Sequence, residues 1–530
     1  MVFKYDKKGK KLIITKSTTL EYNQVKIWLE RHVKGFRFMP AFKRGLWDGK
    51  INHFNQGTID MGLWKEVAKA LQEIGSKMEL ENKRDFPMNR KVTKEKVEDF
   101  CKEFFKDHYL IDKKTGEKID FFPYEHQIDT AFKILKNQFC TAEVATSGGK
   151  SLIISIVYFY ILKYLEPDAK LLLIVPSITL VTQFFDDMME YNDGANKENT
   201  NPIDIKIQEI MSDKPRKWHG EGEPNIYIST YQSLSKVKNF GKEFYAQFYS
   251  VATDEAHLAK SESFIKILKI TGKTATYQFG MSGTFQDDGF AEYLTIQSLT
   301  GPKVAKVSAK ELQEKGIISF VRISQIYLNH DDPVFRDNIK EVRKSPNSGA
   351  AAYRLEGDYI RNSEPRKEFI YKLLKNIKNN TLILFNIIDY GTSLRDYLVE
   401  KFEEDDNVEF YMIYGAIKKD ERERIKKEME IEDGKIRILV ASYGTLSTGV
   451  SIKNLHNIIF AEGFKAEQRI IQSIGRSLRL HETKEIASIY DLVDTYTEEH
   501  NNNVLFRHGK DRRDMYTKHE YPYKIKKFML

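Results

Sequence analysis

The stretch VATSGGKSL, residues 144–152, has the composition of a loop that holds the phosphates of a nucleotide. Gly148 and Gly149 are small enough for backbone N–H groups to point inward at phosphate oxygens, and Lys150 supplies a cation for the β- and γ-phosphates. The hydroxyl of Ser151 is a ligand for Mg²⁺, and the helix expected after it presents its positive N-terminal end to the anion. The stretch therefore predicts a phosphate-binding loop followed by a helix, in a protein that binds ATP and Mg²⁺.

The match to the phosphate-loop consensus GxxxxGK(S/T) is incomplete, because Val144 stands where the consensus has glycine. Thr146 and Ser147 complete the loop and are expected to contact the nucleotide. A glycine-rich turn ahead of the buried helix LIISIVYFYIL (residues 152–162) is the alternative interpretation. Other motifs in the chain are needed to distinguish a nucleotide-binding loop from such a turn.

The second motif is Asp254-Glu255-Ala256-His257, which follows the strand-like segment YSVAT. Open α/β sheets bind their ligands at the carboxyl ends of strands. There Asp254 can hold Mg²⁺ through its water ligands and Glu255 can orient the attacking water. Two adjacent acids at a strand end are also common without any such role.

The third motif is QSIGRSLR, residues 472–479. Arg476 and Arg479 are three residues apart, so on a helix both guanidinium groups project from one face. Such a pair can enter a phosphate site and stabilise the charge of the transferred phosphoryl group. An arginine pair that bridges surface carboxylates is the alternative for this segment alone, but three motifs in this order favour an ATPase.

The pattern of apolar runs predicts two doubly wound α/β domains in tandem after a small α+β domain. Strands are expected at residues 171–175, 226–230, 250–253 and 277–281, and in a second series at 381–386, 409–413, 436–441, 457–461 and 487–491. Near-continuous apolar strands between helices indicate parallel sheets covered on both faces. We expect domains at residues 1–88, 89–310 and 311–530.

The first 88 residues alternate strand and helix patterns. We expect strands at 11–15 and 50–54, a helix at 20–33 opened by Thr18 or Thr19, and a helix at 63–75 closed by Gly75. The Lys- and Glu-rich segment 83–100 is expected to be a connector that runs into a helix.

Positive charge is concentrated at the ends of the chain. The 530 residues carry a net charge of +8, and residues 1–50 alone hold 13 Lys and Arg against 4 Asp and Glu. The last 24 residues, from Arg507 onward, hold 8 basic and 3 acidic side chains. Clustered cations bind polyanions by releasing counterions from a phosphate backbone, although a charged end can also be a solvated face.

Other compositional features exclude several classes of protein. Two cysteines without metal-ligand spacing argue against a disulfide framework or a zinc site and fit a reducing cytosol. The longest apolar run has 11 residues, about half of a membrane span, and the basic N-terminus lacks the apolar segment of a secretion signal. We therefore expect a cytoplasmic protein that does not bind membranes.

Basic and aromatic residues alternate in FRFMPAFKRGLWDGK, residues 36–50. The cations are Arg37, Lys43, Arg44 and Lys50, and the rings are Phe36, Phe38, Phe42 and Trp47. This interleaving is typical of a site where rings stack on unpaired bases and cations follow the backbone. Alternatively, the rings form the core of the small domain and Trp47-Asp48-Gly49 is a turn.

From about residue 120 to 495, the motifs in this order resemble those of the superfamily 2 helicases and translocases. The matching segments are FPYEHQ, the phosphate loop, LLLIVPSITLVTQF, TYQSL, DEAH, Ser282-Gly283-Thr284, ILFNIIDYGTSL, SYGTLSTGVSIKNL and QSIGRSLR. Gly283 replaces a usual alanine, and Ser451 stands where many members have aspartate, which leaves an ATP contact there in doubt. The QxxGRxLR form is similar to that of duplex-DNA translocases.

A narrower resemblance runs nearly end to end. GFRFMPAFKRGLWDGKI, YGTLSTGVSIKNLH and the late RHGKDR resemble the UvsW recombination helicases of tailed phages, in which an N-terminal α+β module precedes two RecA-like domains. The resemblance implies a phage protein, active in the host cytoplasm, that remodels Holliday junctions, forks, D-loops and R-loops. Its partner would be branched or duplex DNA, or an RNA–DNA hybrid; protein partners are not indicated.

The resemblance also implies residue roles. Gln127 would read adenine, Gly449 and Gln472 would contact the nucleotide, and His257, Ser282 and Thr284 would couple the ATP and nucleic-acid sites, unless they are ordinary core polar residues. ATP would lie between the two RecA-like domains. Phosphates of one strand would contact polar residues at loop tips: Ser177, Thr179, Thr230, Gln232, Asn386, Thr445 and Thr448.

Three other functions stay open. A motor subunit of a restriction or defence system shares these motifs, but only about 50 residues follow QSIGRSLR, too few for a typical added domain. An RNA helicase is compatible with phosphate contacts, because the 2′-OH is what separates RNA from DNA. A non-catalytic scaffold is disfavoured by retention of the Lys, acidic and Arg residues of all three motifs.

Overall fold

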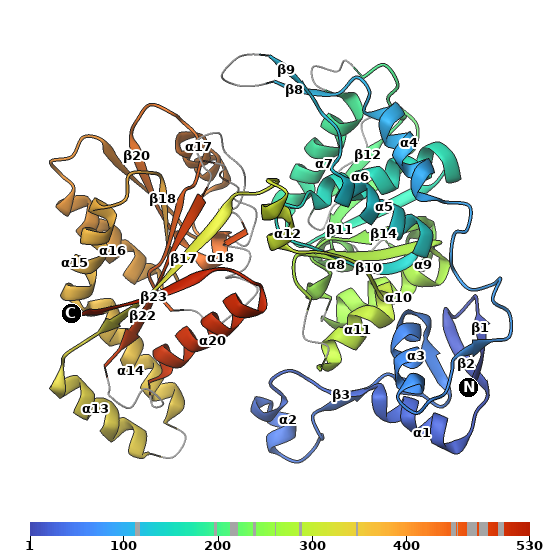
Figure 1. The fold of residues 1–530 in the computed structure, drawn as a ribbon, viewed down its shortest axis with the longest axis horizontal. Coiled ribbons are helices and arrows are strands. Elements are labelled where there is room, and N and C mark those ends of the chain that lie inside the picture. The colour runs from blue at the N-terminus through green and yellow to red at the C-terminus, as the bar shows by residue number, and fades with distance from the viewer. Residues whose placement is uncertain are drawn as a thin grey trace. The chain divides into compact units, whose positions relative to one another are not determined.

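A computed structural model describes most of the chain: residues 1–111, 117–194, 199–211, 221–236, 240–259, 261–285, 289–345, 348–446, 452, 454–463, 474–475, 486–496 and 503–530. The chain forms two compact units (Figure 1). The first contains Met1–Ala145 and Gly149–Val307, and the second contains Thr146–Gly148 and Ser308–Leu530. Each unit is described by itself.

The N-terminal part of the first unit is an α+β layer. Its five-stranded sheet has the order β5-β6-β2-β1-β7, with β1 Val2–Asp6, β2 Lys11–Lys16, β5 Phe54–Asn55, β6 Thr58–Asp60 and β7 Glu79–Leu80. The helices are α1 Thr19–Trp28, α2 Pro40–Lys43 and α3 Trp64–Gln72, with short 3₁₀ turns η1 Phe36–Phe38 and η2 Met61–Leu63. A separate hairpin joins β3 Glu30–His32 to β4 Lys50–Asn52.

Two predicted elements of this part have different bounds in the structure. The helix expected at 20–33 is capped by Thr18, as predicted, but ends at Trp28, because residues 30–32 pair with β4 instead. The strand expected at 50–54 is split between β4 and β5, which belong to different sheets. The first error comes from the pairing of β3 with β4, about 20 residues away, and the second arises because β4 pairs with β3 whereas β5 pairs with β6.

The rest of the first unit is an all-parallel seven-stranded sheet of order β12-β13-β11-β14-β15-β10-β16. Its strands are β10 Phe139–Val144, β11 Lys170–Val175, β12 Ile207–Ile210, β13 Ile226–Thr230, β14 Phe248–Thr253, β15 Tyr277–Ser282 and β16 Lys303–Val307. Its helices are α4 Lys94–Phe104, α5 Glu125–Asn137, α6 Lys150–Tyr160 (continued by η3 Ile161–Leu165), α7 Ile178–Asp193, α8 Tyr231–Lys236, α9 Lys242–Ala246, α10 Glu262–Thr274 and α11 Ala291–Thr300. A 3₁₀ turn, η5 Ala256–Leu258, follows β14, and a small hairpin joins β8 Tyr109–Ile111 to β9 Lys118–Asp120.

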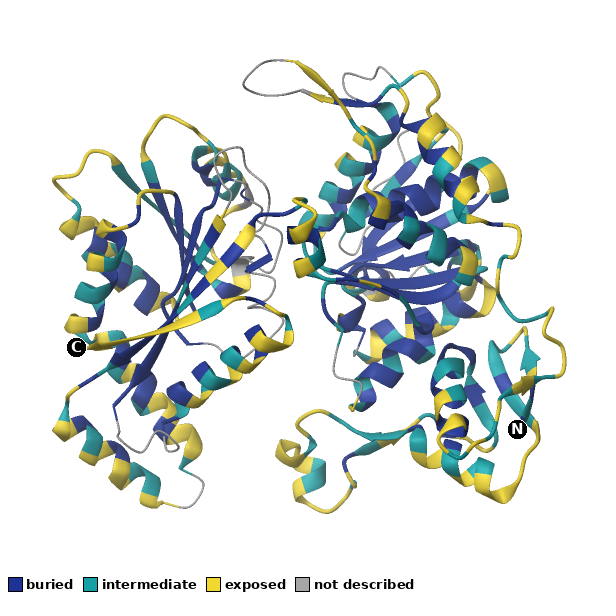
Figure 2. Ribbon diagram, in the orientation of Figure 1, coloured by how far each residue is buried: buried dark blue, intermediate teal, exposed yellow. Residues whose placement is uncertain are grey.

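The second unit repeats this architecture with the strand order β19-β20-β18-β21-β22-β17-β23, again all parallel. Its strands are β17 Phe320–Asn329, β18 Thr381–Phe385, β19 Val408–Ile413, β20 Ile436–Ser442, β21 Asn457–Phe460, β22 Ile486–Thr495 and β23 Tyr523–Met529. Its helices are α12 Ala309–Glu314, α13 Pro333–Lys344, α14 Gly349–Asn362, α15 Glu364–Lys375, α16 Ile388–Lys401, α17 Lys419–Met429, α18 Tyr443–Leu446 and α20 Val504–Lys518. The central strands of both large sheets are buried (Figure 2).

All nine strands expected in the two series are present, and the tandem arrangement of parallel sheets is confirmed. The strands that the pattern missed include β10, which carries the phosphate loop, and β17 and β23, which lie at one side of the second sheet. β10 reads FCTAEV and is less continuously apolar than its neighbours, so its composition gives a weaker signal.

The N-terminal layer packs on α11 of the parallel-sheet part. Tyr293 and Leu294 of α11 belong to the same hydrophobic cluster as Phe3, Leu63 and Val67. A Cβ on Gly62 would collide with the backbone of α11, so the two parts approach as closely as a glycine allows. The N-terminal layer is therefore anchored to the helix that follows Ser282–Thr284 in the chain.

Candidate functional site

The phosphate-loop segment connects β10 to α6, and the helix predicted after the loop is present. Gly149 precedes the helix in the left-handed conformation, with a φ of 79°, and Ser147 also has a positive φ of 67°. A Cβ on Gly149 would collide with Nε2 of Gln127. The left-handed backbone angle favours glycine there, and an added Cβ would push the end of the Gln127 side chain aside.

Gln127 is held at the start of α5. The backbone N–H of Tyr124 donates to its Oε1 at 2.8 Å, which forms part of a capping arrangement, and the side chain is buried. The structure thus brings together a glutamine and a loop glycine that are 22 residues apart in sequence.

Three neighbouring strands bring the motifs of the first unit together. β14, β15 and β10 are adjacent in the sheet, and their carboxyl ends lead to Asp254, Ser282 and the phosphate-loop segment. Nζ of Lys150 lies 3.5 Å from Oε1 of Glu255. The carboxyl edge of these strands is where an open α/β sheet binds its ligand.

Asp254 is buried, with 7% of its surface exposed, and its backbone N–H donates to the carbonyl of Ile174 at 2.9 Å. Its Oδ1 is buried without a hydrogen-bond partner among the residues that the structure describes. Burial and the neighbouring Glu255 charge raise the pKa of Asp254 to about 6. A buried carboxylate oxygen without a partner fits a hydrated divalent cation.

Glu255 adopts a left-handed backbone conformation, with φ 49° and ψ 48°, which is uncommon for a residue with a side chain. Burial alone would raise its pKa, but the charge of Lys150 and the hydrogen bond from His257 outweigh burial and hold the pKa well below its usual range. Glu255 is therefore an ionised carboxylate in a nearly closed environment.

His257, Ser282 and Thr284 form a buried hydrogen-bonded group beside Glu255. Nδ1 of His257 lies 2.7 Å from Oγ of Ser282 and 3.1 Å from Oε2 of Glu255. The Ser282 hydroxyl also lies 2.7 Å from the Thr284 carbonyl and 3.2 Å from the Glu255 carboxylate. The DEAH and Ser-Gly-Thr motifs are thus in direct contact.

The candidate nucleic-acid residues of the first unit follow two adjacent strands, β11 and β13. Ser177 caps α7, and Thr179 is half-buried in its first turn. Gln232 is exposed, but Thr230 is buried and its hydroxyl donates to Ser233 at 2.9 Å. Thr230 therefore shapes the loop, whereas Gln232 is free to reach a ligand.

In the second unit, Asn386 is exposed after β18, and its backbone N–H donates to Glu462 at 2.7 Å. The other site residues expected in this unit lie outside the described part of the chain, or, for Thr445, have no described side chain: Thr445, Thr448, Gly449, Gln472, Arg476 and Arg479.

The basic residues of the N-terminal region fall into two groups. Arg37, Lys43 and Arg44 are exposed and form no ion pair within the described residues. Lys50 is bound to Glu30 at 2.7 Å, and Trp47 is half-buried and donates from Nε1 to the Lys50 carbonyl at 2.8 Å. The predicted turn at Trp47–Gly49 is present, since the Lys50 N–H donates to Asp48.

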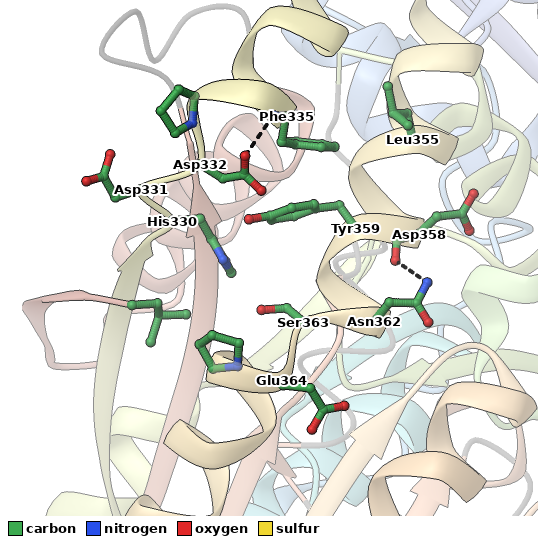
Figure 3. A pocket seen from close by; sticks show the side chains of 13 residues that line it. His330, Asp331, Asp332, Phe335, Leu355, Asp358, Tyr359, Asn362, Ser363 and Glu364 are labelled. Carbon is green, nitrogen blue, oxygen red and sulfur yellow. Dashed lines mark hydrogen bonds between the residues drawn. The ribbon is translucent and has the colours of Figure 1, made fainter.

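A pocket of about 670 Å³ in the second unit is a different kind of site (Figure 3). The stacked rings of Phe335 and Tyr359, 3.8 Å apart, lie in it beside the carboxylate of Asp332. Four acidic residues line it: Asp331, Asp332, Asp358 and Glu364. The excess of carboxylates disfavours a nucleotide, and none of the predicted site residues lines this pocket.

The comparisons with known proteins agree with this arrangement. Residues 91–287 match the family model "Type III restriction enzyme, res subunit", and residues 365–481 match "Helicase conserved C-terminal domain". The ATP-dependent DNA helicase uvsW of Enterobacteria phage T4 is 28% identical over 522 residues, which are 95% of each chain. Over nearly its whole length the chain is thus similar to UvsW, and both matched segments are of helicase or restriction-motor type.

Solved structures show likeness of fold. The crystal structure of T4 UvsW covers 100% of this UvsW-like chain and 99% of its own, at 24% identity and a TM-score of 0.47. The ATP-dependent Type ISP restriction-modification enzyme LlaBIII bound to DNA matches 79% of this chain and 32% of its own, with a TM-score of 0.58 at 13% identity. No helix in the described portion is both long and apolar enough to cross a membrane.

Sequence reasoning about this UvsW-like chain missed two residues. Tyr191 places its hydroxyl 3.4 Å from Oγ of Ser151, and nothing in its surroundings in the sequence indicates this. Buried Glu462 accepts from the backbone N–H groups of Asn386 and Ile387 and from Arg361. Glu462 could have been found, because an acid that directly follows the expected strand NIIFA is the same signal as DEAH.

Proposed function

We propose that this chain couples ATP hydrolysis to movement along DNA and remodels branched DNA, such as Holliday junctions, forks, D-loops and R-loops. The observation that supports it best is the group Lys150, Asp254 and Glu255 at the carboxyl ends of neighbouring strands. The similarity to a phage DNA helicase over 95% of both chains supports the choice of DNA.

Glu255 would orient the attacking water. Its pKa, held well below its usual range by Lys150 and His257, makes it a weak base before nucleotide binds. When the Lys150 ammonium moves to the β- and γ-phosphates, Glu255 loses its nearest cation and becomes a better proton acceptor. Arrival of the substrate would thus switch on the residue that activates water.

Asp254 and Ser151 would hold Mg²⁺, Asp254 through water. The partnerless Oδ1 of Asp254 fits this role, and the bound ion would neutralise charge on the phosphates. Thr146, Ser147, Gly148 and Gly149 would bind phosphates through their backbone, and Gln127 would recognise adenine. Gly449 and Gln472 are proposed as further nucleotide contacts, and Arg476 and Arg479 as guanidinium donors to the transferred phosphoryl group.

Phosphates of one DNA strand would contact polar groups that carry no base information, so movement would be independent of sequence. The proposed contacts are Ser177, Thr179, Gln232, Asn386, Thr445 and Thr448, with Thr230 supporting their loop. His257, Ser282 and Thr284 would transmit the state of Glu255 to this surface. Residues 1–88, 89–310 and 311–530 would act as a DNA-binding module and two motor modules.

A restriction or defence motor is the second candidate, favoured by the match of residues 91–287 to the res-subunit family. Such a motor translocates on duplex DNA without remodelling branches. The two candidates differ in their substrates, so one set of assays separates them.

The experiment measures ATP hydrolysis with no nucleic acid, plain duplex DNA, a fork, a four-way junction, an R-loop and RNA, and strand separation on the branched substrates. We expect branched DNA to stimulate hydrolysis most and to be converted to products. Stimulation by plain duplex without any branch conversion would support the restriction motor instead, and stimulation by RNA alone would overturn the DNA assignment.

Lys150→Ala is the negative control in each assay, because it removes the phosphate cation. Lys163→Ala is its matched control, since Lys163 lies on the same helical segment and pairs with exposed Glu103. Hydrolysis that survives in Lys150→Ala would have to come from a contaminant or from another site.

A further inference from the structure

Residues 33–50, here called the N-terminal excursion, leave the N-terminal layer between β3 and β4 and carry α2 (Figure 1). The Val33 N–H donates to the Gly49 carbonyl at 2.8 Å and closes its base. The tip presents two large apolar side chains to solvent: Phe38 is 80% exposed and Leu46 is 73% exposed. Both exceed every other large apolar side chain described in the first unit.

The aromatic residues of the excursion have divided roles. Phe36 packs edge-on against Phe42 with centroids 4.8 Å apart and stacks on His32 at 4.3 Å. A Cβ on Gly49 would collide with the Phe36 ring, so the turn closes tightly on it. Phe36 and Phe42, both half-buried, therefore pack on each other, and Phe38 lies outside this contact.

Three exposed cations belong to the same segment as Phe38 and Leu46. Arg37 precedes Phe38 in the chain, Lys43 is the last residue of α2, and Arg44 caps the end of that helix. The only acidic residue in residues 33–50 is Asp48, which accepts the Lys50 N–H in the turn. Exposed apolar side chains near cations complement a polyanion that also has flat apolar faces. The last base pair of a DNA duplex has both features.

The base of the excursion is fixed to the motor part of the same unit. The Lys34 N–H donates to both carboxylate oxygens of Glu292 at 3.1 and 3.2 Å, and Nε2 of His53 lies 3.3 Å from Oγ1 of Thr295. Both partners are on α11, which packs against the N-terminal layer. The same unit holds Lys150 and Glu255. A movement that starts at these residues would therefore reach the tip without passing through a flexible linker.

We propose that the tip of the N-terminal excursion is a wedge, in which Phe38 and Leu46 enter the junction of branched DNA and stack on its last base pair. Arg37, Lys43 and Arg44 hold the diverging backbones beside it. Stacking of a base on an aromatic ring replaces the stacking on the neighbouring base pair that is lost when the junction opens. The wedge therefore offsets the cost of opening about one pair, and translocation renews the junction. The inference rests on the proposed function.

The test compares wild type with the double variant Phe38→Ala/Leu46→Ala in the full-length chain. Leu20→Ala/Ile27→Ala is the matched control, because these side chains are 64% and 69% exposed on α1 of the same layer, outside the excursion. Three quantities are measured: the dissociation constant for a synthetic fork, fork-stimulated ATP hydrolysis, and the single-turnover rate of fork unwinding.

We expect the tip variant to unwind the fork at least tenfold more slowly than the control, while affinity falls by a clearly smaller factor and hydrolysis at saturating fork stays within about twofold. Equal unwinding rates in the two double variants would overturn the wedge and leave the tip as a surface for a protein. An affinity loss as large as the unwinding loss would also overturn it, since the tip would then only anchor DNA. Wild type without DNA-stimulated hydrolysis would contradict the proposed function itself.

A second variant guards against a folding defect. Phe38→Trp/Leu46→Phe keeps the apolar surface and should unwind at nearly the wild-type rate. Failure of this variant together with an unchanged melting temperature would show that stacking surface is not what the tip supplies, and would overturn the proposal.

Discussion

The phosphate-loop region and the N-terminal excursion both carry residue types typical of phosphate binding, yet their structures differ. Around Lys150 the charged groups are buried and held by one another, with Glu255 at 3.5 Å and His257 behind it. On the excursion Arg37, Lys43 and Arg44 are exposed, and no ion pair within the described residues fixes them. The side chains around Lys150 are therefore held in fixed positions, as catalysis requires. Those of the excursion can adapt to ligands of different shape.

Asp254→Asn tests the buried side of this comparison and should have the largest effect. Loss of the carboxylate that would hold Mg²⁺ is expected to slow hydrolysis by about 10²–10³-fold, the range for one preorganised charge-stabilising group. The measurement is the steady-state rate at saturating ATP and Mg²⁺. A loss under threefold would remove Asp254 from the metal site.

The same variant should be more stable than wild type in a defined pH range. Because burial raises the pKa of Asp254 to about 6, the folded state binds its proton more tightly than the unfolded chain. The stability that protonated Asp254 contributes to wild type is therefore lost as pH rises from about 4 to 6. The melting temperature of Asp254→Asn relative to wild type, without Mg²⁺ or nucleotide, should rise over that interval and stay constant above it. A difference independent of pH would contradict the assignment.

Ser282→Ala should give an intermediate effect, because it removes the hydroxyl that joins His257 to Thr284. We expect the ratio of DNA-stimulated to basal hydrolysis to fall by about tenfold, consistent with loss of a buried hydrogen-bonded group that contributes roughly 1–3 kcal/mol. Ser298→Ala on α11 is the control, since that hydroxyl only bonds to its own helix. An unchanged ratio would leave Ser282 with a purely structural role.

Gly149→Ala, compared with Gly57→Ala, separates the effect of backbone strain from the effect of disturbing the contact with Gln127. Gly57 has nearly the same φ, 80° against 79°, but open space around it, so Gly57→Ala reports the left-handed penalty of about 1–2 kcal/mol alone. We expect Gly149→Ala also to displace Gln127 and to weaken discrimination of ATP from GTP. Equal nucleotide preference in both variants would argue against an adenine-reading role for Gln127.

Arg44→Ala tests the exposed side and should have the smallest effect. Removing one phosphate contact should lower the slope of log affinity against log salt by about 1. Lys50→Ala is a useful contrast, because Lys50 is paired with Glu30, and should change the slope less. A larger change for Lys50 than for Arg44 would reverse the assignment of these cations.

The same contrast explains what the sequence could predict. Parallel-sheet strands such as LLLIV and TLILF were found because burial on both faces makes them continuously apolar. Lys150 was found from the glycine-rich loop that contains it, Asp254 from the strand that it follows, and Ser282 from the family resemblance. Their grouping follows from the strand order β14-β15-β10, which needs long-range pairing and was not visible locally.

The excursion shows where local patterns were insufficient. Phe36, Phe38, Phe42 and Trp47 look alike in the sequence, and both stacking and core roles were open for all of them. Only packing distinguishes Phe38, which is exposed, from Phe36, which is half-buried against Phe42, His32 and Gly49. Leu46 was not considered, because a single leucine in a basic segment gives no signal.

Glu255→Gln tests the central claim most directly. The substitution keeps the shape of the side chain but removes the charge that orients water and pairs with Lys150. We predict that the variant binds ATP with Mg²⁺ at least as tightly as wild type, measured by calorimetry, while DNA-stimulated turnover falls below about one hundredth of the wild-type rate. Undiminished DNA-stimulated turnover in Glu255→Gln would contradict the account.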